Sequence, residues 1–180
     1  MTTACLSFFR NTLRASLLAA AVVSPTAFAG PTEVLFKAAF TISEVVGFGN
    51  SSGCDASVPI YPTNSTGMIN GSGYASHLGK TLLASTDCIV FTSTTTFNFS
   101  SNSLVLQAAN GDRLLGTYRG VATVLSPGVL QLAGFFDIKN GTGRFAGATG
   151  AGTLDGLEDI SGGFSQPAAG TVMLSGKISY

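Results

Sequence analysis

The sequence predicts an all-β protein whose roughly eight strands close into an antiparallel barrel, with few or no helices in the mature chain. Short runs alternate between apolar residues and small or polar ones, and Asn-Gly, Gly-Asp and Pro-Gly pairs separate the runs, as in consecutive antiparallel strands. No long stretch repeats its apolar positions at helical spacing. The 23 glycines let strands bend and approach one another, which favours a closed barrel over an open sheet with exposed edges. A β-sandwich is the alternative.

The first 29 residues have the features of a secretory signal peptide. Arg10 and Arg14 give a positive start, residues 15–23 are apolar, and a small-x-small cleavage site ends at Ala29. The apolar run is about nine residues long, whereas a membrane-spanning helix needs about 20. We therefore expect cleavage after Ala29, a single barrel domain over residues 30–180, and a secreted or periplasmic location.

The first predicted strand shows the alternation most clearly. Over residues 33–46 one face is polar and the other is apolar. The apolar face carries Val34, Phe36, Ala38, Phe40 and Ile42. Further strands are predicted near residues 66–76, 80–86, 89–99, 103–109, 114–124, 129–138, 145–156 and 171–180.

Two irregular segments interrupt the strands. Residues 47–65 contain Gly, Pro, Asn and Ser at a density that regular structure does not tolerate, so they are predicted to form a long loop at one barrel end. Residues 157–169 form the second irregular segment and include the acidic pair Glu158-Asp159. We interpret this pair as solvated, because the multidentate oxygen spacing of a calcium loop is missing.

The cysteines predict a disulfide bond. Cys5 lies in the leader, which leaves Cys54 and Cys88 as the only cysteines of a chain exported to an oxidising compartment. Two free, buried thiols are the alternative, since cysteine also behaves as a small hydrophobic residue. The two sulfurs and the single histidine, His77, would give a metal three ligands at most, and they lack the paired spacing of zinc modules. No metal or cofactor is therefore expected.

Charge and side-chain chemistry argue against several function classes. Without Arg10 and Arg14 the chain has seven basic and nine acidic residues, and the basic residues are scattered singly, so nucleic-acid binding is not expected. One histidine and no free cysteine argue against conventional hydrolases. We interpret His77 as a hydrogen-bonded structural residue.

Two segments share an Asn-Gly start that is followed by Arg and two glycines. They are NGDRLLGTYRG at residues 110–120 and NGTGRFAGATG at residues 140–150. Since Asn-Gly supports a tight turn, they are predicted to be equivalent hairpins. The longer segment NGTGRFAGATGAG at residues 140–152 is similar to the Gly-rich strand of the allene oxide cyclase and dirigent barrels. Together with HLGK at residues 77–80 and NGDRLLGTY at residues 110–118, it resembles a group of uncharacterised secreted bacterial proteins that share this barrel.

This resemblance implies a calycin-like, eight-stranded antiparallel barrel with an apolar cavity. The plant proteins are often trimers, so the resemblance also implies a possible homo-oligomer. It transfers no activity, because the acidic and tyrosine residues that the plant enzymes use lie outside the shared Gly-rich motif.

The strand predicted at residues 114–124 indicates an internal pocket around Tyr118. The residues that share its face are Leu114, Gly116, Gly120, Ala122 and Val124. Several of them are too small to fill the centre of an eight-stranded barrel, so space is expected around the tyrosine. Phe36, Phe40 and Phe136 are the other candidates to line this pocket, unless they meet across the axis and fill it.

The expected function is to hold a small apolar molecule, and either to carry it or to steer its cyclisation or coupling by shape, as a cyclase or isomerase of the allene oxide cyclase or dirigent type. A small outer-membrane barrel is one alternative. Residues 92–96 (TSTTT) argue against it, because they would place hydroxyl groups on the lipid face. A structural or adhesive surface protein without a pocket is the other alternative.

Overall fold

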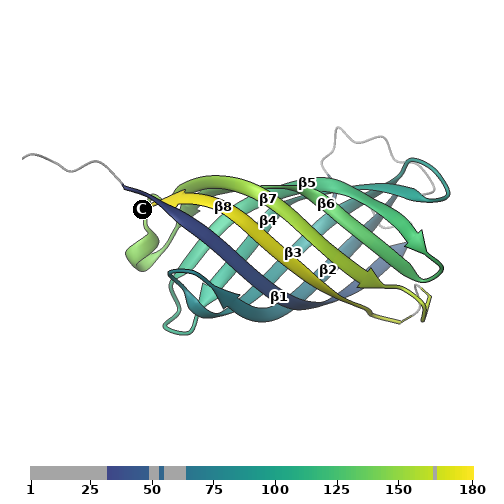
Figure 1. Cartoon of the computed structure of the whole chain (residues 1–180), viewed down its shortest axis with the longest axis horizontal. Coiled ribbons are helices and arrows are strands. Elements are labelled where there is room, and N and C mark those ends of the chain that lie inside the picture. Colours follow the sequence, from purple (N-terminus) through teal and green to yellow (C-terminus); the bar gives the residue numbers. More distant parts are fainter. Residues whose placement is uncertain (1–31, 49–52, 55–63, 164–165) are drawn as a thin grey trace, which may run out of the picture.

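Eight antiparallel strands close into a barrel in the computed structural model, which describes residues 32–48, 53–54, 64–163 and 166–180. Each strand pairs with the next one in the chain, and the last pairs with the first (Figure 1). The strands are β1 (Glu33–Phe48), β2 (Asn64–Ala75), β3 (Gly79–Phe91), β4 (Thr96–Ala108), β5 (Arg113–Ser126), β6 (Val129–Gly141), β7 (Thr149–Asp159) and β8 (Ala168–Ser179).

The predicted fold class is therefore confirmed. One 3-10 turn, η1 (Gly143–Phe145), is the only helical element of the described residues. None of the helical structure described in the chain is long and apolar enough to cross a bilayer. The predicted leader with its cleavage site at Ala29 lies outside the described residues, as does most of the loop predicted over residues 47–65.

Inward-facing phenylalanines lie opposite glycines on neighbouring strands. Phe136 of β6 pairs with Gly152 of β7, and Phe99 of β4 pairs with Gly120 of β5. A Cβ atom on either glycine would overlap the ring of its partner. The missing side chains therefore make room for large rings inside a barrel whose interior is just wide enough for side chains.

The prediction of three short strands over residues 80–109 is wrong, because two long strands, β3 and β4, occupy this part of the chain. The pairing register shifts between Ala84 and Cys88, and again between Ser101 and Leu104. Such β-bulges add unpaired residues and interrupt the alternation of apolar and polar side chains. In the sequence each bulge therefore resembles the end of a strand.

The seventh strand also differs from its prediction. It begins at Thr149, because η1 occupies the preceding residues, and it continues to Asp159. Since β8 begins at Ala168, the segment predicted to be irregular over residues 157–169 is shorter at both ends.

The two Asn-Gly segments lie at the same end of the barrel but form different connections. Residues 109–112 join β4 to β5 tightly, whereas residues 142–148 join β6 to β7 and contain η1. The two connections are linked by a hydrogen bond of 3.0 Å from the Arg113 backbone N–H to Thr142 Oγ1.

The interior has two halves that differ in packing. In the half near the C-terminus, here called the packed half, Phe36, Phe136 and Phe145 are fully buried, and the first two rings lie 5.8 Å apart between centroids. The other half, where the odd-numbered strands end, is called the cavity half (Figure 1). The packed half resembles an ordinary protein core, and the cavity half holds the candidate site.

Candidate functional site

A cavity of about 80 Å³ occupies the cavity half of the barrel. Its wall is aliphatic or aromatic except at four positions, Glu44, Asp87, Tyr118 and Glu158. These four residues lie on the odd-numbered strands β1, β3, β5 and β7, respectively. An apolar pocket with a few convergent polar groups is the usual form of a small-molecule site.

Strand alternation directs the three carboxyl groups into the barrel. Glu44, Asp87 and Glu158 are only 6%, 3% and 5% exposed. Each lies on the same face of its strand as a buried aliphatic residue two or four positions earlier, namely Ile42, Leu83 and Leu154. Aspartate and glutamate are almost never this buried unless they are paired, so three of them distinguish this cavity from an ordinary core.

The carboxyl groups contact one another and Tyr118. The Tyr118 hydroxyl, itself buried, donates a hydrogen bond of 3.3 Å to Asp87 Oδ2. Glu44 and Glu158 are close enough to form a hydrogen bond when one of them holds a proton. The four side chains therefore form one cluster, here called the acid cluster.

One oxygen atom of each carboxyl group in the acid cluster lacks a donor, and no counter-charge lies among the described residues of the cavity wall. No donor of the described residues reaches Glu44 Oε1, Asp87 Oδ1 or Glu158 Oε1, although all three atoms are buried. Of the described residues that line the cavity, none is a lysine, an arginine or a histidine. A buried carboxylate without a partner is strongly unfavourable, so protons or a bound molecule must compensate the cluster.

Burial makes the cluster retain protons. The pKa of Glu44 is raised to about 10, mainly by burial and then by the charges of Glu158 and Asp87. Burial and the charge of Glu158 also raise the pKa of Asp87 to about 7, while hydrogen bonds from Tyr118 and the Gly67 backbone act in the opposite direction. Burial raises the pKa of Glu158, against the effect of its hydrogen bond with Glu44. Near neutral pH the cluster can therefore both donate and accept protons.

Two glycines provide the space for this arrangement. Gly67 of β2 pairs with Asp87, and a Cβ atom at Gly67 would overlap Glu44 Oε1 and Asp87 Oδ1. At Gly170 of β8, a Cβ atom would lie 2.7 Å from Glu158 Cγ. The acid cluster therefore requires glycine on the strands between the acidic residues.

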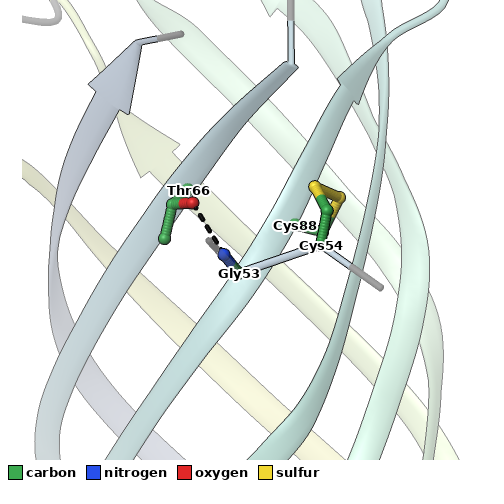
Figure 2. Close-up of a disulfide and its surroundings, with 4 residues drawn as sticks. All are labelled: Gly53, Cys54, Thr66 and Cys88. Carbon is green, nitrogen blue, oxygen red and sulfur yellow. Dashed lines mark hydrogen bonds between the residues drawn. A yellow bond between two sulfur atoms is a disulfide. The ribbon is translucent and has the colours of Figure 1, made fainter. Parts of the chain in front are cut away.

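A disulfide lies beside the cluster. Cys54 and Cys88 are bonded, with Cα atoms 4.5 Å apart, as predicted (Figure 2). Cys88 directly follows Asp87, so the bond attaches the segment after β1 to the wall next to the acid cluster. The Gly53 N–H donates a hydrogen bond of 2.9 Å to Thr66 Oγ1 and holds the same segment against β2 (Figure 2). The disulfide points to a location outside the cytoplasm, because thiols inside the cytoplasm are kept reduced.

The aromatic residues singled out in the sequence lie in different halves of the barrel. Tyr118 lines the cavity. Phe36, Phe40 and Phe136 are buried but do not line it. Outside the cavity, His77 hydrogen-bonds through Nε2 to the backbone oxygen of Leu35 at 2.9 Å, as expected of a structural histidine.

The acid cluster is the feature that the sequence interpretation missed. The description of Glu158-Asp159 as a solvated pair is wrong for Glu158, which is buried, whereas Asp159 is exposed and accepts a hydrogen bond of 2.8 Å from the Ser161 N–H. The alternation that begins in the predicted strand at 33–46 already assigns Glu44 to the apolar face. An acidic residue on an apolar face was therefore the available signal.

In the described part of the chain, no group of three or more His, Cys, Asp or Glu side chains is arranged to hold a metal ion. Comparisons with models of protein families, with curated proteins and with solved structures found no match.

Proposed function

We propose that this barrel binds a small, largely apolar molecule in its cavity half, with the polar group of that molecule placed against the acid cluster. The observation that carries the proposal is the cavity of about 80 Å³, whose wall is apolar except for Glu44, Asp87, Tyr118 and Glu158. Apolar walls provide affinity by removing ligand surface from water, and a few fixed polar groups provide orientation.

We further propose that the protein acts after export, in the periplasm or outside the cell, and that it belongs with the allene oxide cyclase and dirigent-like barrels. The leader-like residues 1–29 and the disulfide support export. The Gly-rich segment at residues 140–152, set in a closed eight-stranded barrel, supports the family proposal.

A second candidate function is the steering of a cyclisation or coupling reaction in the same cavity. The observation that favours it is that the pKa of Asp87 is raised to about 7. A group that titrates near the working pH is well suited to donate or accept a proton during a reaction. Product analysis with Asp87→Asn separates a cyclase from a carrier. A cyclase loses its product yield in this variant, whereas a carrier gives no product in either protein.

The outer-membrane alternative receives less support from the charge distribution. Outer-membrane barrels have an apolar band outside and a polar interior. Here the cavity wall is apolar apart from the acid cluster, and Lys37, Arg119 and Lys177 are exposed on outward positions of the strands. Fractionation of exporting cells tests this point. Recovery only in detergent-extracted outer membrane, with heat-modifiable gel mobility, would favour the membrane alternative.

Binding of the small neutral alcohol n-hexanol, measured by calorimetric titration, tests the proposed function. The wild-type protein should bind it saturably, and Tyr118→Trp should weaken binding by about tenfold or more, because a larger side chain crowds a small cavity. Tyr74→Trp is the matched control, since Tyr74 is 70% exposed on the outside of β2. Absence of saturable binding, or equal losses in the two variants, would contradict an internal site.

A further inference from the structure

The acid cluster favours one chemical class of ligand for the proposed cavity, because its three carboxyl groups have no cationic partner among the described residues. Carboxyl groups inside proteins are normally paired with a positive group or a metal ion. As far as the chain is described, the cavity wall contributes neither a basic side chain nor a carboxyl arrangement suited to a metal. The buried oxygens of Glu44, Asp87 and Glu158 that have no donor are therefore available to accept hydrogen bonds from a bound ligand.

Aromatic rings surround the same space. Phe91 and Phe97 meet edge to face, with centroids 4.8 Å apart, and Phe99 and Tyr118 lie 6.0 Å apart. All four line the cavity. The faces of aromatic rings attract organic ammonium groups, and this attraction increases when the cation is removed from water.

We propose that the cavity selects a small organic cation, an amine with an apolar substituent, whose ammonium group lies among Glu44, Asp87 and Glu158. This inference rests on the proposed function and specifies its ligand. The ammonium N–H groups would donate to the carboxyl oxygens that have no donor, and the substituent would contact the aliphatic and aromatic wall.

The dimensions limit the bound group. A cavity of about 80 Å³ is smaller than the engineered cavity of about 150 Å³ that holds benzene, so it accommodates only a few non-hydrogen atoms. The lining residues Val46, Phe91 and Ile160 lie at or next to strand ends and are partly exposed. A longer substituent would therefore extend past them toward the end of the barrel.

The cluster should release protons when the cation binds, because a nearby positive charge favours the ionised form of a carboxyl group. Among the described residues, the titratable groups that face the cavity are Glu44 on β1, Asp87 on β3, Tyr118 on β5 and Glu158 on β7. The lining residues on the even-numbered strands are not titratable. Protons and the ammonium group would compete for the same oxygens, so affinity for the cation should increase from pH 5 to pH 8.

Three probes with the same chain, n-hexylammonium, n-hexanol and hexanoate, test the inference by calorimetric titration of the full exported protein. Hexylammonium should bind at least about tenfold more tightly than hexanol, and hexanoate should bind most weakly. Titrations in two buffers of different ionisation enthalpy should reveal net proton release with hexylammonium only.

Variants locate the cation within the molecule. Asp87→Asn combined with Glu158→Gln should lower the affinity for hexylammonium by about tenfold and change that for hexanol by less than about threefold. Asp155→Asn is the matched control, because it removes an acid that is exposed on β7. Circular dichroism verifies that each variant is folded.

The possible outcomes separate this inference from the proposed function. If hexanol binds but hexylammonium binds no more tightly than hexanol, the cavity takes neutral polar groups and the inference is overturned. The same conclusion follows if Asp155→Asn lowers hexylammonium affinity as much as the cavity variant does. If none of the three probes binds, the proposed function and the inference both fail.

Discussion

Replacing Glu44 by glutamine should make the stability of the fold less dependent on pH. Glutamine keeps the size of the side chain and can donate a hydrogen bond to Glu158, but it cannot ionise. Glu44 has a pKa of about 10 in the folded protein and an ordinary value of 4.5. Between these two values the folded chain holds a proton that the unfolded chain has released.

The sign of the effect follows from this difference. Since the folded state binds more protons than the unfolded state, the free energy of unfolding decreases as the pH rises above 4.5, and it decreases until the folded-state pKa is reached. One such group contributes a slope of about 1.4 kcal/mol per pH unit. Asp87, raised from 3.8 to about 7, adds a second contribution of the same sign below pH 7.

Together, Glu44 and Asp87 should therefore lower the free energy of unfolding of the wild-type protein by up to about 3 kcal/mol per unit between pH 5 and pH 6, and Asp87 alone should lower that of Glu44→Gln by up to about half as much. These are upper limits, because water that enters the cavity weakens the effect of burial. For a domain of this size, 1 kcal/mol corresponds to about 2–4 °C in Tm.

Thermal and guanidinium chloride unfolding of the disulfide-bonded protein at pH 5, 6, 7 and 8 measures the slopes. Asp155→Asn should reproduce the wild-type slope, since its side chain is exposed on the outside of the barrel. Parallel profiles for the wild type and Glu44→Gln, or a wild-type stability that increases with pH, would refute the reasoning. Either result would mean that Glu44 is ionised in the folded protein.

Three further predictions concern the surroundings of the cluster. Gly67→Ala should destabilise the fold by about 1–3 kcal/mol in thermal unfolding, because its Cβ would displace two carboxyl groups; an unchanged Tm would contradict the observed packing. Replacing Cys54 and Cys88 together by serine should cost about 3–4 kcal/mol by guanidinium unfolding, and two titratable thiols in the denatured, non-reduced wild type would rule out the bond. Tyr118→Phe removes a hydrogen bond that lowers the pKa of Asp87, so carbon-13 NMR should show this carboxyl titrating above pH 7; an unshifted midpoint would exclude the bond.

Local patterns predicted the barrel because alternation is a local property. The inward positions of β1, such as Phe36 and Phe40, and of β5, such as Tyr118, are buried as the alternation requires. The pattern was misleading where a bulge changed it, between Ala84 and Cys88 and in β4. A bulge depends on the pairing of two strands, and its interrupted alternation cannot be distinguished in the sequence from the end of a strand.

The acid cluster depends on pairing over the whole barrel. Glu44 and Glu158 belong to β1 and β7, which do not pair with each other but both pair with β8. Their approach is therefore set by the closing contact between the first and the last strand, which no local pattern predicts. The sequence does place Glu44 on an apolar face, but it does not show whether another acid or a base lies opposite.

The division of the barrel into two halves explains how the chain tolerates three buried acids. Phe36 and Glu44 lie on the same face of β1, eight positions apart, so one continuous strand contributes to both halves. Truncation of a large buried aromatic residue such as Phe36 typically costs about 3–5 kcal/mol, which shows how strongly the packed half holds each strand. Removing an uncompensated buried acid should instead increase the free energy of unfolding near neutral pH. A cavity variant that gains stability and loses hexylammonium binding would therefore identify the acid cluster as a functional site that is maintained at the expense of stability. Functional sites are the places where residues are expected to depart from the rules of core packing.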